Sequence, residues 1–169
     1  MSSAEPTPKK STESYPQPPQ IPRLLIDADA LVAGAFSTTG ASRLILRLGE
    51  LAILDCIAPV QVREEAERNL RRKMPDALPA FHTLVERALT IVPDPSTDAL
   101  VFFSAQAHPE DASILAAAVL NGCQYLITFN TRHYFPDKNT RVIVCAPGRF
   151  LQRLRQVVGV LAQAGAGGQ

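Results

Sequence analysis

The stretch that decides the fold is Arg23-Leu24-Leu25-Ile26-Asp27-Ala28-Asp29-Ala30-Leu31-Val32. Its apolar run, 24–26, does not alternate with polar residues, which is typical of a strand buried on both faces of a parallel sheet. The Ala, Leu and Val spacing that follows favours a helix. Asp27 and Asp29 therefore stand where a buried strand ends and a helix begins. Ligands of open α/β sheets bind outside the carboxyl ends of the strands, so these two carboxylates are the first candidates for a functional site.

A purely structural role explains the same pair. A carboxylate in front of a helix accepts hydrogen bonds from the free N–H groups of the first turn, and Asp27 is well placed to do so. The sequence around Asp27 alone does not separate capping from chemistry.

The composition is that of one folded domain. The chain has 169 residues, and its 46% hydrophobic content is enough for a core. Residues 24–129 carry 8 basic and 13 acidic side chains, whereas residues 130–169 carry 6 and 1. An acidic body followed by a basic region suits a protein that concentrates cations and meets a polyanion beside them, although scattered solvated charges would give the same counts.

The cysteines and the hydropathy pattern indicate the compartment. Cys56, Cys123 and Cys145 lie in or beside apolar runs without paired spacing, so we expect buried free thiols in a reducing cytosol. The N-terminus lacks an apolar signal core, and no run approaches the roughly 18 residues that span a bilayer. We therefore expect a soluble, cytoplasmic protein that does not contact membranes.

The domain organisation follows from proline and glycine content. Residues 1–22 hold six prolines among polar residues and are expected to form a disordered tail. Residues 23–158 are expected to form the folded domain, and the Gly/Ala-rich residues 159–169 a flexible C-terminal tail.

Strands and helices are expected to alternate along the domain, which favours a parallel sheet covered by helices on both faces. After the first strand and helix, strands are expected over 52–57, 90–92, 124–128 and 141–145. Helices are expected over 41–48, 59–73, 80–89, 111–120 and 150–161. The first of these should place Leu44, Ile45 and Leu48 on one face. Residues 98–107 remain open between helix and strand.

Polar residues recur at equivalent places in this pattern, at a strand end or in the first turn of a helix. Besides Asp27 and Asp29 they are Asp111, which a favourable interaction with the helix dipole would also explain, and Asn130. If the fold brings these side chains together, they form a set of hard oxygen ligands that suits Mg²⁺ or Mn²⁺. An ion would also offset their repulsion, which is about 4 kcal/mol for two charges 4 Å apart at an effective dielectric constant of 20.

Five segments, taken together and in order, carry a family resemblance: 24–32, 40–43, 64–70, 110–118 and 125–130. They resemble the PIN-domain nucleases, and the resemblance extends over about residues 22–152. It implies a three-layer α/β/α sandwich with a five-stranded parallel sheet. It also implies a metal-dependent endoribonuclease site built from acidic residues.

The resemblance assigns roles to individual residues. Asp27 and Asp111 match two metal-binding acidic positions of the family. Glu65 matches the glutamate of a helix, but one extra residue after Pro59 leaves Glu64 as an alternative. These residues would hold Mg²⁺ or Mn²⁺, so that a bound water is activated for attack on a phosphodiester.

Two departures from the family pattern affect the site. The family usually has Asp-Thr-Asn where this chain has Asp27-Ala28-Asp29, and its fourth acidic position is Asn130 here. Asp29 or Asn130 is expected to position the water or a second ion. If Asp29 does not replace the missing charge, the domain is a catalytically silent module that binds RNA or a protein partner.

Basic residues follow the fourth expected strand. Arg132, His133, Lys138 and Arg141 could hold RNA phosphates as point charges, although each could equally be a plain surface residue. His133 is also a weaker candidate for a general acid, because a lone histidine in a loop is usually solvated.

The resemblance implies an endoribonuclease that acts on single-stranded or structured RNA. Many small members of the family are VapC-like toxins of type II toxin–antitoxin pairs. That implies a small antitoxin partner, and a homodimer is a further expectation. A strand that ends in Asp-x-Asp also resembles haloacid-dehalogenase phosphatases. No lysine lies between Lys73 and Lys138, and no Gly-Asp-x-x-x-Asp follows, so the chemistry of that family has no support here.

Overall fold

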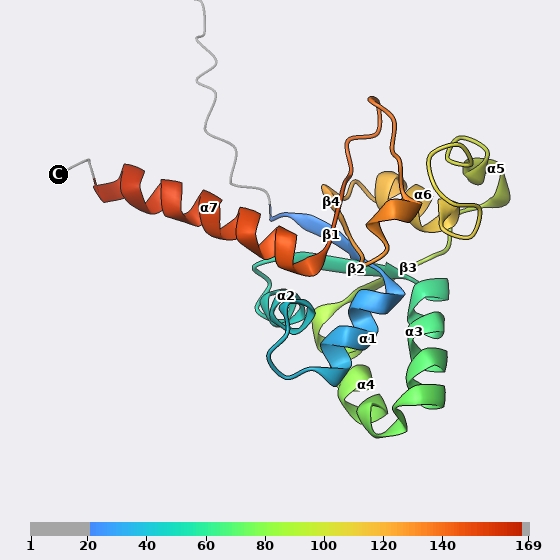
Figure 1. Cartoon of the computed structure of the whole chain (residues 1–169), viewed down its shortest axis with the longest axis horizontal. Coiled ribbons are helices and arrows are strands. Elements are labelled where there is room, and N and C mark those ends of the chain that lie inside the picture. The colour runs from blue at the N-terminus through green and yellow to red at the C-terminus, as the bar shows by residue number, and fades with distance from the viewer. Residues whose placement is uncertain (1–20, 167–169) are drawn as a thin grey trace, which may run out of the picture.

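A five-stranded, fully parallel sheet forms the centre of the molecule in a computed structural model that describes residues 21–166 (Figure 1). The strand order is β3-β2-β1-β4-β5. The strands are β1 Arg23–Ile26, β2 Asp55–Pro59, β3 Thr90–Val92, β4 Tyr125–Ile127 and β5 Ile143–Cys145. The five-stranded parallel sheet expected from the sequence is confirmed.

Helices cover both faces of this sheet (Figure 1). One face carries α1 Ala28–Phe36, α2 Ala41–Glu50, α3 Val60–Lys73 and α4 Leu78–Ala88, with the short 3₁₀ turn η1 Pro75–Ala77 before α4. The other face carries α6 Ala112–Leu120, which packs on β1 and β4 beside the short α5 Thr97–Leu100. The 3₁₀ turn η2 Thr131–His133 follows β4. The three-layer α/β/α arrangement is therefore also confirmed.

The last helix departs from the compact body. Helix α7 Pro147–Ala166 packs against α2 and then extends outward (Figure 1). The sequence predicted a helix over 150–161 with an irregular tail after it, so the helix is longer than expected at both ends. Residues 159–166, expected to belong to the flexible C-terminal tail, are helical. The rest of that tail, 167–169, and residues 1–20 of the expected N-terminal tail lie outside the described residues.

Strand β1 occupies the middle of the sheet. Its residues Leu24, Leu25 and Ile26 are at most 1% exposed, and the strand pairs with β2 on one side and β4 on the other. From β1 the chain builds the sheet in one direction through β2 and β3, and later returns to build it in the other direction through β4 and β5. The order therefore reverses between β1 and β4, and open α/β proteins bind ligands at such a switch point.

The register at the switch point fixes two residues side by side. Ile26 pairs with Ile127, and the Asp27 N–H donates to the Ile127 carbonyl over 2.9 Å. Asp27 and Thr128, the next residue of each strand, therefore share the carboxyl edge of the sheet at its centre.

Several local predictions need correction. The second strand is β2 Asp55–Pro59, later than the expected 52–57, because residues 51–54 turn after α2. Leu44 was expected on one face with Ile45 and Leu48, but it is 50% exposed, and Ile45 is buried together with Leu46. The open segment 98–107 contains the end of α5 followed by turns. Cys56, Cys123 and Cys145 are free and buried, as expected. Within the described residues, none of the helices combines the length and apolar character that a bilayer crossing requires.

Candidate active site at the switch point

Asp27 is a buried carboxylate at the end of the central strand. It is 6% exposed, and Oδ1 accepts from the Ala28 N–H over 2.7 Å, so the residue does cap α1 as expected. Oδ2 accepts from the Tyr134 hydroxyl over 3.1 Å. Burial, and then the charge of Asp29, raise the pKa of Asp27 from 3.8 to about 6, and both hydrogen bonds act in the opposite direction. Capping of α1 therefore accounts for the hydrogen bond of Oδ1, whereas Oδ2 contacts Tyr134 and is not used by the cap.

Asp29 lies beside it and connects the first turn of α1 to the end of β4. Its Oδ2 accepts from the Phe129 N–H over 2.9 Å and from the Thr128 hydroxyl over 3.3 Å. Its Oδ1 is buried and has no hydrogen-bond partner. Burial raises the pKa of Asp29 as well. The two carboxylates on either side of Ala28 therefore form a closely spaced acidic pair with one oxygen unsatisfied.

Tyr134 links the segment after β4 to this pair. Its buried hydroxyl donates to Asp27, and the pKa of the phenol is raised by burial first, then by the negative charges of Asp27, Asp111 and Asp29. All three carboxylates therefore lie close enough to act on one hydroxyl group. The sequence alone did not single out Tyr134 or Thr128, because neither stands out in the strand and loop pattern around them.

Asp111 reaches the same place from the start of α6. His133 Nδ1 lies 2.9 Å from Asp111 Oδ2, the distance at which a protonated Nδ1 donates to a carboxylate. The His133 ring also packs against the His108 ring, with the centroids 5.2 Å apart. Asp111 makes no side-chain cap with α6, so capping does not account for this aspartate.

Glu64 and Glu65 are consecutive residues of α3. Both are surface neighbours of Gln61, at three and four residues' distance, and Gln61 Oε1 accepts from the Ser113 hydroxyl at the start of α6 over 3.2 Å. Glu64 lies near Arg68, with 4.0 Å between the charged groups. Both glutamates are exposed. The contact of Gln61 with Ser113 therefore places this part of α3 next to the start of α6, and it applies to Glu64 and Glu65 alike.

The remaining predicted residues differ in their position relative to the carboxylates, and the Asn130 backbone N–H lies beside Asp29. The Asn130 side chain is exposed after β4, and Arg132 is exposed on η2. Lys138 lies in an exposed turn between η2 and β5. Arg141 precedes β5 and lines a surface pocket with Gln124, which precedes β4, so it lies at the opposite, amino-terminal edge of the sheet. The structure does not bring Arg141 to the acidic site.

A family model described as a PIN domain matches residues 23–132. The chain belongs to the PIN-domain family. No curated protein sequence matches it significantly.

Solved structures agree with this PIN domain in fold. PAE2754 from Pyrobaculum aerophilum aligns with a TM-score of 0.56 and 17% identity, covering 80% of this chain and 97% of that one. VapBC2 from Rickettsia felis, bound to a DNA fragment from its promoter, aligns with a TM-score of 0.57 and 13% identity, covering 73% and 98%. At these identities the similarity concerns the fold alone.

The donor set of the PIN domain fits a hard divalent cation. Asp27 and Asp29 repel each other in a buried place, and the buried Asp29 Oδ1 lacks a donor, so a cation would stabilise both. Within residues 21–166, however, no three His, Cys, Asp or Glu side chains are arranged closely enough to hold one ion together. Asp27 and Asp29 are brought together, Asp111 is linked to them through His133 and Tyr134, and Glu65 is on the facing helix surface without a contact to them.

Replacing Asp27 by Asn should stabilise the metal-free PIN domain at neutral pH. The folded chain holds the Asp27 proton more tightly than the unfolded chain does, so wild-type stability falls as pH rises from about 4 to about 6. Asp27→Asn removes this loss, and we expect the variant to be more stable by about 2–3 kcal/mol at pH 7 but similar to wild type below pH 4.

Urea unfolding of both proteins in EDTA, measured from pH 4 to pH 8, tests this expectation. A difference in stability that did not change with pH would contradict the assignment of a raised pKa to Asp27.

Proposed function

We propose that this PIN domain is a divalent-metal-dependent endoribonuclease that hydrolyses phosphodiester bonds in RNA. The observation that carries the proposal is the convergence of Asp27, Asp29 and Asp111 on the His133–Tyr134 segment at the switch point of the sheet. A structural scaffold does not need three carboxylates there, because each adds repulsion and desolvation cost.

The roles follow from position. Asp27, Asp111 and Glu65 would hold Mg²⁺ or Mn²⁺, which lowers the pKa of a bound water and offsets charge that develops on the phosphate oxygens. Asp29 has a free buried oxygen beside Asp27 and would orient the attacking water. Arg132, exposed next to His133, would hold a neighbouring phosphate as a point charge.

A second candidate function is a catalytically silent PIN module that binds RNA or a protein partner. It is supported by the exposed amide at position 130, where the family usually has an acid, and by Ala28 in place of the usual threonine. Metal-dependent cleavage separates the two, because a silent module holds RNA without cutting it whichever ion is present.

We also propose that the nuclease is the toxin of a type II toxin–antitoxin pair. Support comes from the fold shared with VapBC2 of Rickettsia felis. A small antitoxin that inserts an arginine or lysine among Asp27, Asp29 and Asp111 would form charge-assisted hydrogen bonds there.

Cleavage of RNA should require both the metal and Asp111. We expect purified protein to cut an end-labelled RNA with Mg²⁺ or Mn²⁺ but not in EDTA. Asp111→Ala should reduce the rate about 100-fold or more, since one lost transition-state contact commonly costs that much. Gel analysis of the products measures both effects, and circular dichroism controls for folding. Wild-type protein that binds RNA but never cuts it would support the silent module.

Glu65 and Glu64 form a matched pair for testing the third ligand. Glu65→Gln should reduce Mn²⁺-dependent cleavage about 10–100-fold, because it removes the charge of the proposed third ligand. Glu64→Gln should retain the wild-type rate, because Glu64 instead lies near Arg63 and Arg68. The same cleavage assay measures both variants. The reverse pattern would assign the ligand to Glu64.

Expression should arrest growth of a bacterial host if the nuclease is a toxin. Asp27→Ala should relieve the arrest, because it removes the carboxylate at the centre of the site. Growth curves after induction measure the effect, with immunoblotting to confirm equal expression. Normal growth at high levels of cleavage-competent wild-type protein would contradict the toxin assignment and leave the nuclease proposal standing.

A further inference from the structure

Several phenylalanine side chains of this chain are exposed to solvent, although a large apolar ring is usually buried. Of its seven phenylalanines, Phe81, Phe103 and Phe150 are buried, whereas four are more than half exposed: Phe36, Phe102, Phe129 and Phe135. Two of these four, Phe129 and Phe135, stand at the two ends of the short segment that also carries His133 and Tyr134.

Both rings are attached to backbone that the acidic site fixes in place. The Phe129 N–H donates to Asp29 Oδ2 over 2.9 Å. Phe135 directly follows Tyr134, whose hydroxyl donates to Asp27, and its own N–H donates to the Gln106 carbonyl over 2.8 Å. The rings are 54% and 53% exposed. Phe129 is therefore exposed beside Asp29, and Phe135 is exposed one residue after the side chain that contacts Asp27.

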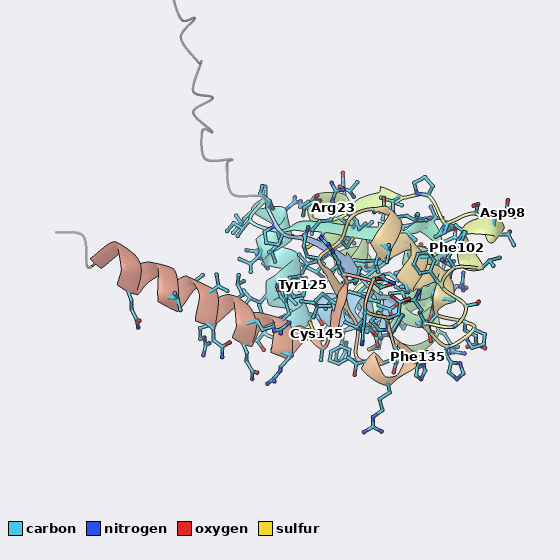
Figure 2. All side chains as sticks on the ribbon, turned by 90° about the horizontal axis from the view of Figure 1, so that it is seen from above. Arg23, Asp98, Phe102, Tyr125, Phe135 and Cys145 are labelled. Carbon is cyan, nitrogen blue, oxygen red and sulfur yellow. The ribbon has the colours of Figure 1, made fainter. Side chains whose placement is uncertain are left out.

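The surface around these rings carries both aromatic and polar side chains. Figure 2 shows Phe135 and Phe102 at the same end of the body, away from α7. The loops that carry them run side by side, joined by a bridge between Ala107 and Tyr134. Along the chain, the exposed side chains of Arg132 and His133 lie between Phe129 and Phe135. This pattern differs from the continuous apolar core that a protein partner would cover.

Nucleobases match such a surface. An unpaired base can stack on an exposed aromatic ring, and this stacking does not depend on which base it is. A nearby arginine can bind the backbone phosphate. A base inside a duplex is already stacked and cannot use these rings. We infer that Phe129 and Phe135 stack on unpaired bases on either side of the phosphodiester that enters the acidic site. This inference rests on the proposed function for its substrate, but it assigns binding to residues outside the acidic set.

Stacking can be tested by substitutions that keep the backbone hydrogen bonds. Phe129→Leu and Phe135→Leu remove the aromatic ring but retain an apolar side chain and the N–H groups that bind Asp29 and Gln106. Phe36→Leu is the matched control, because Phe36 is 65% exposed but lies at the far end of α1, about 13 Å along the helix from Asp27.

The measurement is fluorescence anisotropy of a labelled single-stranded oligoribonucleotide with the full chain in EDTA. Each ring substitution should weaken binding about tenfold, and Phe36→Leu should leave it unchanged. An oligoribonucleotide with abasic positions should bind the wild-type protein about as weakly as the intact strand binds a double variant that combines Phe129→Leu and Phe135→Leu. The two substitutions should not weaken binding of the abasic strand further. The duplex form of the RNA should bind less tightly than the single strand and should be insensitive to both changes.

Three results would overturn the inference. They are wild-type affinity in both variants, equal losses on intact and abasic strands, or duplex binding as tight as that of the single strand. If RNA binding is unchanged and the variants instead release a protein that wild type retains, the rings form a protein contact and the inference also fails. Cleavage with Mn²⁺ on the same preparations tests the proposed function separately. Ring-dependent binding without cleavage rejects the nuclease alone, and cleavage that ignores both rings rejects the stacking alone.

Discussion

The burial of the Asp27 carboxylate at the end of the central strand is the constraint on which the site depends. Leu24–Ile26 is covered on both faces, so the residue that follows lies at the middle of the sheet edge with 6% exposure. A buried carboxylate is tolerated only where hydrogen bonds or charges compensate for lost water. The Ala28 N–H and the Tyr134 hydroxyl supply such hydrogen bonds, and the pKa of Asp27 still rises to about 6. The start of α1 and the segment after β4 are thus positioned by one side chain.

The acidic side chains are joined to the segment after β4 by three contacts. Phe129 contacts Asp29, His133 contacts Asp111, and Tyr134 contacts Asp27. A cation bound as proposed above, at Asp27 and Asp111, would lie next to the His133 and Tyr134 donors of this segment. Metal binding at these carboxylates would therefore be coupled to the conformation of the segment after β4.

The sequence predicted the parts of the structure that depend on local pattern. The apolar run at 24–26 identified the central strand, and the position of Asp27 after it predicted the cap of α1 that the structure shows. Tyr134 could not be predicted, because its burial depends on Asp27, 107 residues away, and not on any periodicity of its own. Leu44 and Leu46 fit a helical face almost equally, so only the packing of α2 decided between them. The position of Arg141 could have been inferred, since a residue that opens a parallel strand lies at the amino edge of the sheet.

The exchange of residues at positions 29 and 130 supports the proposal of an active site over that of a silent module. The family usually has an amide at the first position and an acid at the second, and this chain has the reverse. The Asp29 carboxylate accepts from the Phe129 N–H and the Thr128 hydroxyl, so its charge lies at the end of β4, the strand that Asn130 follows. The negative charge at the end of β4 is thus supplied from α1 in this chain. A silenced scaffold would gain stability by losing this second buried carboxylate, whose repulsion raises the pKa of Asp27. Retaining the charge at the same edge of the sheet is unfavourable unless a cation offsets it, which is the condition that the nuclease proposal supplies.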